Sequence, residues 1–125
     1  MSERQQYFPG RAPIDAYGNG GFRFADMSHR GSLLLLPSGI YGWDIAAPSQ
    51  LTLASFSAVL AERDAFEFLL LGTGAAQVFP HPGIRRAFED AGLGLEIMST
   101  GAAARTFNVL LAEKRAVAAA LLAVA

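Results

Sequence analysis

Residues 66–124 read FEFLLLGTGAAQVFPHPGIRRAFEDAGLGLEIMSTGAAARTFNVLLAEKRAVAAALLAV, and this stretch decides the fold. Short apolar runs typical of buried strands alternate with longer segments whose apolar residues have helical spacing. The pattern predicts strands over 66–72, 94–98 and 116–124 and helices over 82–92 and 100–115. An alternation of strand and helix indicates a sheet with helices packed on it. We therefore assign the chain to the α/β class.

The segment 82–92 carries the clearest helical signal. Its apolar residues Ile84, Ala87, Phe88 and Ala91 recur at i, i+3, i+4 and i+7, which places them on one face of a helix. Gly92 follows this face directly, and glycine commonly ends a helix because it tolerates the left-handed backbone conformation. We expect this helix to bury its apolar face against the sheet.

The first half of the chain has the pattern of antiparallel hairpins. Two pairs of β-prone runs are separated by turns rich in glycine or proline, at residues 18–21 and 37–39. Residues 33–36 are four consecutive leucines, so this strand is apolar on both faces and should be central in its sheet. A short helix is expected between an N-cap at Thr52 and about Glu62.

Length and composition limit the classes of protein that the chain can represent. The 125 residues are expected to form one domain, 1–125, with a loosely ordered segment at 1–12. The formal net charge of −1 lacks the basic excess of nucleic-acid-binding proteins, so we expect no nucleic-acid partner. The apolar runs are too short for a membrane-spanning helix, and the first residues show no secretory signal, which suits the cytoplasm.

Few residues offer catalytic or metal chemistry. The chain has no cysteine, which excludes thiol nucleophiles and zinc–thiolate sites. Its two histidines, His29 and His81, lack metal-ligand spacing to a second ligand, so we expect no metal and no cofactor. Ser99, His81 and Asp44 could be written as a triad, but no nucleophile elbow supports one. These observations favour a non-catalytic protein over an enzyme, without assigning either.

The tetrapeptide Thr-Gly-Ala-Ala occurs at 73–76 and again at 100–103, each time after a predicted strand. Ligands of α/β sheets bind beyond the carboxyl ends of parallel strands, where glycine lets a ligand approach the backbone. The two copies should therefore lie at one sheet edge. They form a candidate anion or ligand pocket that consists of Gly72, Thr73, Gly74, Ser99, Thr100, Gly101 and Arg105. The alternative is structural: an N-cap, a tight turn and a surface arginine.

Aromatic residues concentrate in the hairpins of the first half. A domain this small has limited room for large rings, so some of them should be exposed and available to a protein partner. The candidate interaction surface consists of Tyr17, Phe22, Phe24, Tyr41 and Trp43. The partner itself is not identified by the sequence, and self-association stays open.

Four segments together resemble the family called domain of unknown function 498: IDAYGNGGFRF at 14–24, GSLLLLPSGIYGWD at 31–44, LLLGTGAAQVFP at 69–80 and LGLEIMSTGAAARTFNVLLAEKRAVAAALL at 93–122. The resemblance implies a three-layer α/β fold with a central mixed sheet. It implies no known catalytic residue. The family includes a mitochondrial assembly factor of respiratory complex I, which implies an assembly-factor-like, protein-binding role. No import signal is visible here, so the chain looks like a bacterial member.

Overall fold

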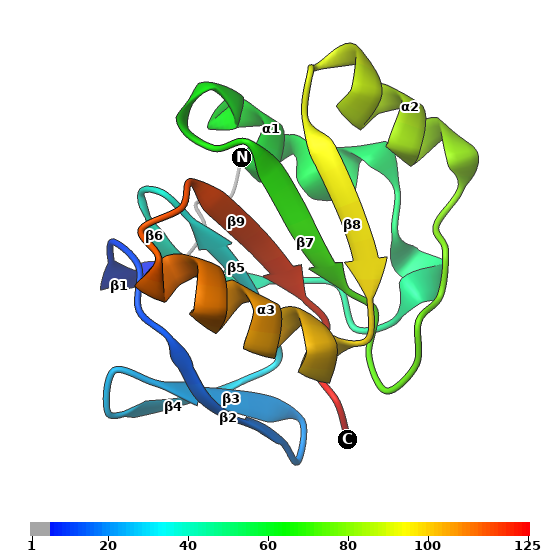
Figure 1. Cartoon of the computed structure of the whole chain (residues 1–125). Helices are drawn as coiled ribbons and strands as arrows, with labels where there is room; N and C mark the ends of the chain where they lie inside the picture. The colour runs from blue at the N-terminus through cyan, green and yellow to red at the C-terminus, as the bar shows by residue number, and fades with distance from the viewer. Residues whose placement is uncertain (1–5) are drawn as a thin grey trace.

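The computed structural model describes residues 6–125, which fold into three layers around a central six-stranded sheet (Figure 1). The strand order of this central sheet is β1-β6-β5-β9-β7-β8. Strands β2, β3 and β4 form a separate three-stranded antiparallel sheet, the small sheet. The strands are β1 Gln6–Pro9, β2 Ile14–Gly18, β3 Gly21–Phe24, β4 Met27–Arg30, β5 Ser32–Leu36, β6 Gly39–Trp43, β7 Phe68–Gly72, β8 Gly94–Met98 and β9 Val117–Leu121.

Strands β7, β8 and β9 are parallel, and β7 lies between the other two. Helix α2, Pro82–Asp90, connects β7 to β8, and helix α3, Thr100–Ala112, carries the chain back across β7 to β9. The two connections run in opposite directions along the sheet. Because such crossovers share one hand, they place α2 and α3 on opposite faces. This mixed α/β topology confirms the predicted fold class and places three strand carboxyl ends at one edge.

Each face of the central sheet has its own apolar core. Helix α2 and helix α1, Ser57–Ala61, cover one face, where Leu34, Leu69 and Phe88 are buried. Three short 3-10 helices lie in the same part of the chain as α1: η1 Pro48–Gln50, η2 Leu53–Phe56 and η3 Arg63–Ala65. Helix α3 and the small sheet cover the other face. The four leucines of β5 are all buried, and β5 lies between β6 and β9, as predicted for a central strand.

The amino-terminal segment differs from the prediction. Residues 6–9 are not loose but form the edge strand β1, which pairs with β6 in the antiparallel direction. The Gln6 side chain adds hydrogen bonds from Nε2 to the Ser38 carbonyl at 3.2 Å and to the Tyr41 hydroxyl at 3.1 Å. The paired residues are 30 to 35 positions apart in the chain, so no local sequence pattern predicts this pairing. Residues 1–5 of the predicted loose segment lie outside the described residues.

The small sheet contains one strand more than the hairpin pattern predicts. Strand β3 ends at Phe24, and Ala25 and Asp26 then turn the chain with φ values of 48° and 62° before β4 begins. Two successive positive φ values match the twist of a two-residue hairpin, which usually has asparagine, aspartate or glycine followed by glycine. Alanine followed by aspartate stands here instead, so the sequence lacks the usual signal for this turn. Helix α3 also ends at Ala112, three residues earlier than predicted.

Candidate functional site

The two Thr-Gly-Ala-Ala segments lie side by side at the carboxyl edge of β7 and β8, as predicted. The Thr100 amide donates to the Gly74 carbonyl at 2.8 Å, and the Gly74 amide donates to the Thr100 hydroxyl at 2.9 Å. The contact is close because Gly72 has no side chain: a Cβ there would lie 2.8 Å from the Thr100 Cα. The repeat therefore joins two loops that begin 27 residues apart in the chain.

The polar groups of this interlock are paired within the fold. Thr100 is fully buried, and its hydroxyl donates to the Leu122 carbonyl beyond β9 at 2.7 Å. The Thr73 amide donates to the Met98 carbonyl at 2.9 Å. The Ala102 amide donates to the Ser99 side chain at 3.3 Å, so Ser99 is the N-cap of α3. We call residues 72–74 and 99–101 the strand-end latch, because they tie together the carboxyl ends of β7, β8 and β9.

The hydrogen bonds of the latch occupy amide groups that the predicted ligand pocket would need. Amide groups that were expected to face an anion, those of Thr73, Gly74, Thr100 and Ala102, donate to protein oxygens instead. Gly101 lies against the Tyr17 phenol, and the Arg105 guanidinium is also near it, 3.4 Å from where a Cβ on Gly101 would be. Arg105 itself is exposed. That these residues bind a ligand remains a prediction. Their structural role, which is to join the ends of β7, β8 and β9, is seen in the hydrogen bonds.

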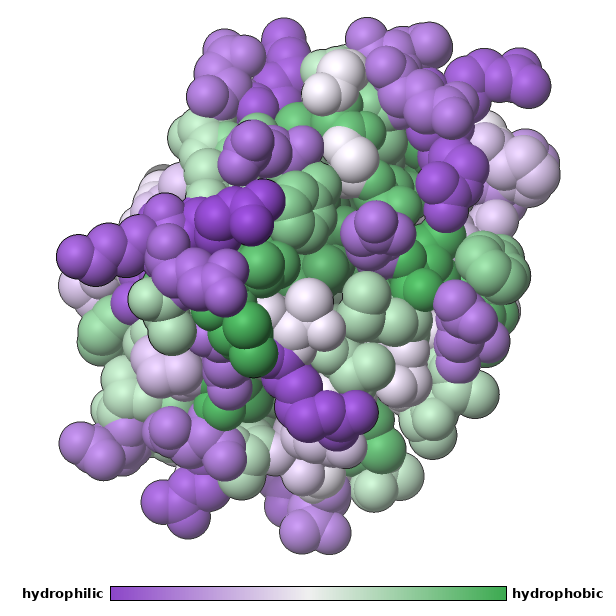
Figure 2. Space-filling view, viewed as in Figure 1, coloured by the Kyte–Doolittle hydropathy of each residue, from purple (hydrophilic) through white to green (hydrophobic). Residues whose placement is uncertain are grey.

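The loop that follows Thr73 is held in one shape and presents apolar side chains to solvent. The Thr73 hydroxyl donates to the Ala76 carbonyl at 2.7 Å and accepts from the Val78 amide at 2.9 Å. The Gln77 side chain donates to the backbone of the edge strand β8 at 2.7 Å. Val78 is 42% exposed and Phe79 is 67% exposed. In Figure 2, hydrophobic atoms gather on the right-hand side, where Figure 1 places this loop.

The predicted aromatic surface requires correction. Phe22 and Phe24 are buried, because the alternation of β3 points them from the small sheet into the core beneath α3. Tyr41 is buried in the core on the α1 and α2 side. Trp43 is half-buried, with its indole nitrogen donating to the Ser55 carbonyl at 3.0 Å. Of the predicted set, Tyr17 alone is exposed, at 44%.

The sequence reasoning did not single out Val78 and Phe79, which the structure exposes. Val78 and Phe79 are two apolar residues between a strand end and a proline, and no periodicity assigns them to a buried face. That mismatch with both helix and strand patterns was the available signal. Helix α2 begins after them, with the His81 ring accepting a hydrogen bond from the Gly83 amide at 2.9 Å.

His29 is a titratable residue in a partly buried position. The His29 ring lies 4.3 Å from the Tyr7 ring, centroid to centroid, in the space between the small sheet and β1. Burial lowers the pKa of His29 from its ordinary value, and a hydrogen bond with the Ser32 backbone partly opposes this shift. No three histidine, aspartate or glutamate side chains within residues 6–125 converge as metal ligands. Over the same residues, no helix is long and apolar enough to cross a membrane.

The fold and the site define a small α/β domain in which the strand ends are joined by hydrogen bonds and the loop after Thr73 exposes Val78 and Phe79. The chain belongs to the family described as "Protein of unknown function (DUF498/DUF598)", whose model matches residues 14–122. An uncharacterized protein of Rhodobacter capsulatus is 38% identical over 98% of this chain and 93% of its own length. A Bartonella henselae protein, described as an outer membrane protein, has a crystal structure that matches with a TM-score of 0.91 and 58% identity, covering 95% of this chain and all of that one.

A eukaryotic relative carries a functional name. The mouse protein "NADH dehydrogenase [ubiquinone] 1 alpha subcomplex assembly factor 3" is 31% identical over 98% of this chain. The match covers 66% of the mouse protein, so about a third of that protein lies outside the match. The chain is thus related to assembly factors at the level of the family.

Proposed function

We propose that this chain is a non-catalytic protein-interaction domain that helps a larger complex to assemble, and that residues 75–80, the apolar loop, form its contact surface. The observation that carries the proposal is the 67% exposure of Phe79 in a loop that hydrogen bonds hold in place. An exposed aromatic side chain on a rigid support is the usual form of a binding anchor, because little entropy is lost when a partner covers it.

The latch and the apolar loop fit together in this proposal. Thr73 belongs to both: its amide pairs at the strand end, and its hydroxyl binds Ala76 and Val78 in the loop. The first copy of the repeated tetrapeptide thus acts as a support for the segment that follows it. Pro80 and Pro82 further restrict the chain on the other side of Phe79. A preorganised loop loses little entropy when a partner covers it, which suits recognition of a protein surface.

The family relationship supports the same role. The mouse relative is named as an assembly factor of NADH dehydrogenase, and the present chain shares 31% of its residues with it across the aligned region. We propose that a protein component of a membrane-associated oxidoreductase is the partner class and that the domain acts from the cytoplasm. The near-neutral charge of −1 implies little long-range steering, so recognition should depend on apolar contact.

The proposal is tested by rescue in cells of the source organism. Cells without the gene should contain less assembled respiratory complex on a native gel, and the wild-type chain should restore it. The variant Phe79→Ala should fail to restore it, whereas Val109→Ala, which alters another exposed apolar residue on α3, should succeed. Equal rescue by both variants would exclude the apolar loop as the contact. Cell fractionation of the rescued strain tests the proposed compartment.

A further inference from the structure

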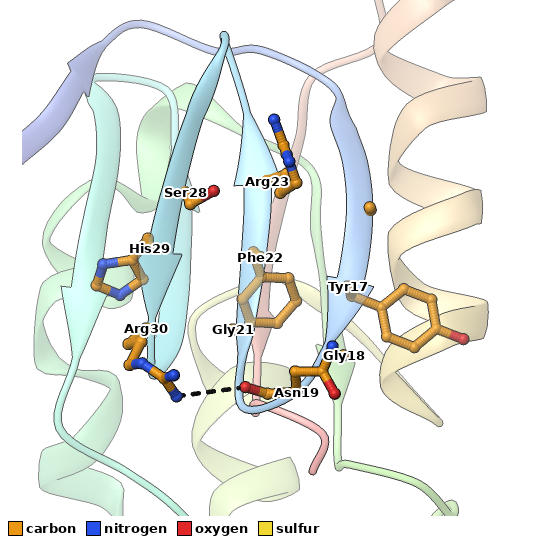
Figure 3. Close-up of a pocket in the computed structure, with 10 residues that line it drawn as sticks. Tyr17, Gly18, Asn19, Gly21, Phe22, Arg23, Ser28, His29 and Arg30 are labelled. Carbon is orange, nitrogen blue, oxygen red and sulfur yellow. Dashed lines mark hydrogen bonds between the residues drawn. The ribbon is translucent and has the colours of Figure 1, made fainter.

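A concave surface on the outward face of the small sheet is separate from both the latch and the apolar loop (Figure 3). Its volume is about 320 Å³, which is near the lower limit for small-molecule pockets. The groove crosses all three strands. Its outward-facing lining residues are Ala16, Gly18, Gly21, Arg23, Ser28 and Arg30, and we call them the outer groove.

The strand register explains both the position and the shape of the outer groove. Arg23 pairs with Ala16 on one side and with Ser28 on the other, while Gly21 pairs with Gly18 and with Arg30. Paired residues of a sheet point to the same face, so these form two adjacent rows. The neighbouring row, which includes Phe22, points into the core instead.

Glycine leaves the floor of the outer groove open. At Gly21 a Cβ would collide with the His29 carbonyl oxygen and lie 3.2 Å from the carbonyl carbon, so no other residue fits there without a shift of β4. Gly18, its partner on β2, has φ at +131°, a region that L residues rarely adopt. The two cross-strand glycines lie in the same row as Arg30 and leave the backbone of β2 and β3 uncovered there, so a ligand can approach it closely.

The charge of the outer groove has one sign. Arg23 and Arg30 are diagonal neighbours on β3 and β4, and no aspartate or glutamate is among the residues that line the groove. The Arg30 guanidinium donates to the Asn19 carbonyl at 3.4 Å, which uses one of its five N–H groups. Arg23 is exposed and has no hydrogen-bond or ion-pair partner within residues 6–125. Neither guanidinium group is neutralised by a carboxylate of the groove lining, so both charges are available to an anion.

We propose that the outer groove binds a small organic phosphate. Arg23 and Arg30 supply guanidinium groups from two strands, and the Ser28 hydroxyl is directly across from Arg23. In Figure 3 the Arg23 and Arg30 side chains extend away from each other, but both are long and exposed, so either can turn toward a bound ligand. Two guanidinium groups and a hydroxyl together match the three terminal oxygens of a phosphomonoester, whereas a planar carboxylate has two oxygens and is satisfied by one guanidinium. The glycine floor then receives the organic part of the ligand. This site differs from the strand-end latch, where the amides are already paired.

The site is tested on the full chain by following backbone amide chemical shifts during titration at constant ionic strength. Glycerol phosphate should cause saturable shifts in residues 16–30, and glycerol should cause none. Replacing either guanidinium, by Arg23→Gln or Arg30→Gln, should weaken binding about tenfold or more, because each loses a charge-assisted contact. Arg105→Gln is the matched control, since it removes an exposed arginine beside the latch and should leave the affinity unchanged.

Several results would overturn the proposal. Shifts that do not saturate, or that inorganic chloride reproduces at equal ionic strength, would show that the groove is only a basic surface. Equal binding of citrate and glycerol phosphate would exclude the phosphate assignment. Loss of binding in Arg105→Gln but not in Arg23→Gln would move the site to the latch. Both groove arginines are exposed, so unchanged melting temperatures of the variants will show that a loss of binding is not a loss of fold.

Discussion

Phe79→Ala is the substitution that separates recognition from folding most sharply in this chain. Phe79 is 67% exposed, so its ring contributes little to the core, and its removal should change the free energy of unfolding by no more than about 0.5 kcal/mol. A phenylalanine can bury roughly 200 Å² in an interface. With 67% of the side chain still available, about 130 Å² can be covered by a partner, and at about 25 cal/mol per Å² this contributes about 3 kcal/mol.

A loss of about 3 kcal/mol corresponds to a decrease in affinity of roughly a hundredfold. Once a partner has been identified, its affinity for the wild-type chain and for Phe79→Ala can be compared by calorimetry, with Val109→Ala as control. Val109 is 57% exposed on α3, so it tests whether any exposed apolar residue matters. The reasoning is refuted if Phe79→Ala binds within about threefold of wild type, or if Val109→Ala weakens binding as much.

Three further outcomes follow from the described contacts. Thr100→Val should lower the free energy of unfolding by about 2–5 kcal/mol, because the half-buried Gly74 amide and the buried Leu122 carbonyl lose their hydrogen bonds to the Thr100 hydroxyl. Denaturant unfolding checks this, and Thr100→Ser should lose clearly less stability. The folded state lowers the pKa of His29, so the unfolded state binds more protons below about pH 6.5, and stability should fall as the pH drops from about 7 to about 5. Thermal melts of His29→Gln should show a flatter dependence of stability on pH. An unchanged slope in this variant would assign the effect to other groups. Gln77→Ala uncovers a backbone carbonyl of the edge strand β8, and sedimentation at high concentration should then reveal more self-association than in wild type; an equally monomeric variant would contradict this.

Much of the fold was predictable because the signals are local. Ile84 and Phe88 are buried on one face of α2, as their spacing predicts, and Gly92 ends the segment with φ at +74°. The leucine run of β5 is central because a strand that is apolar on both faces must be covered on both. The place of the two Thr-Gly-Ala-Ala segments also followed from the order of strands and helices, since parallel strands connected through helices end at one edge.

The candidate site depended on contacts that no local pattern contains. A glycine-rich strand end has the same sequence pattern whether its amides face a ligand or a neighbouring loop. In this structure Gly72 lies against Thr100, and the amides bond to the neighbouring loop. The pattern of aromatic residues in β3 is compatible with an exposed face or a buried one. Phe22 and Phe24 are buried because the small sheet packs beneath α3.

The sequence by itself determined the class of fold, the central strand and the edge at which the repeated segments meet, because periodicity and chain connectivity act over short distances. The tertiary structure alone decided which polar groups are paired, which aromatic rings are covered and which arginines share a surface. Arg23 and Arg30 are seven positions apart in the chain, and the pairing of β3 with β4 makes them diagonal neighbours on one face of the small sheet. Hydrogen bonding and burial depend on the groups that folding brings together, and at the latch those groups, Gly74, Thr100 and Leu122, come from segments more than 20 residues apart in the chain.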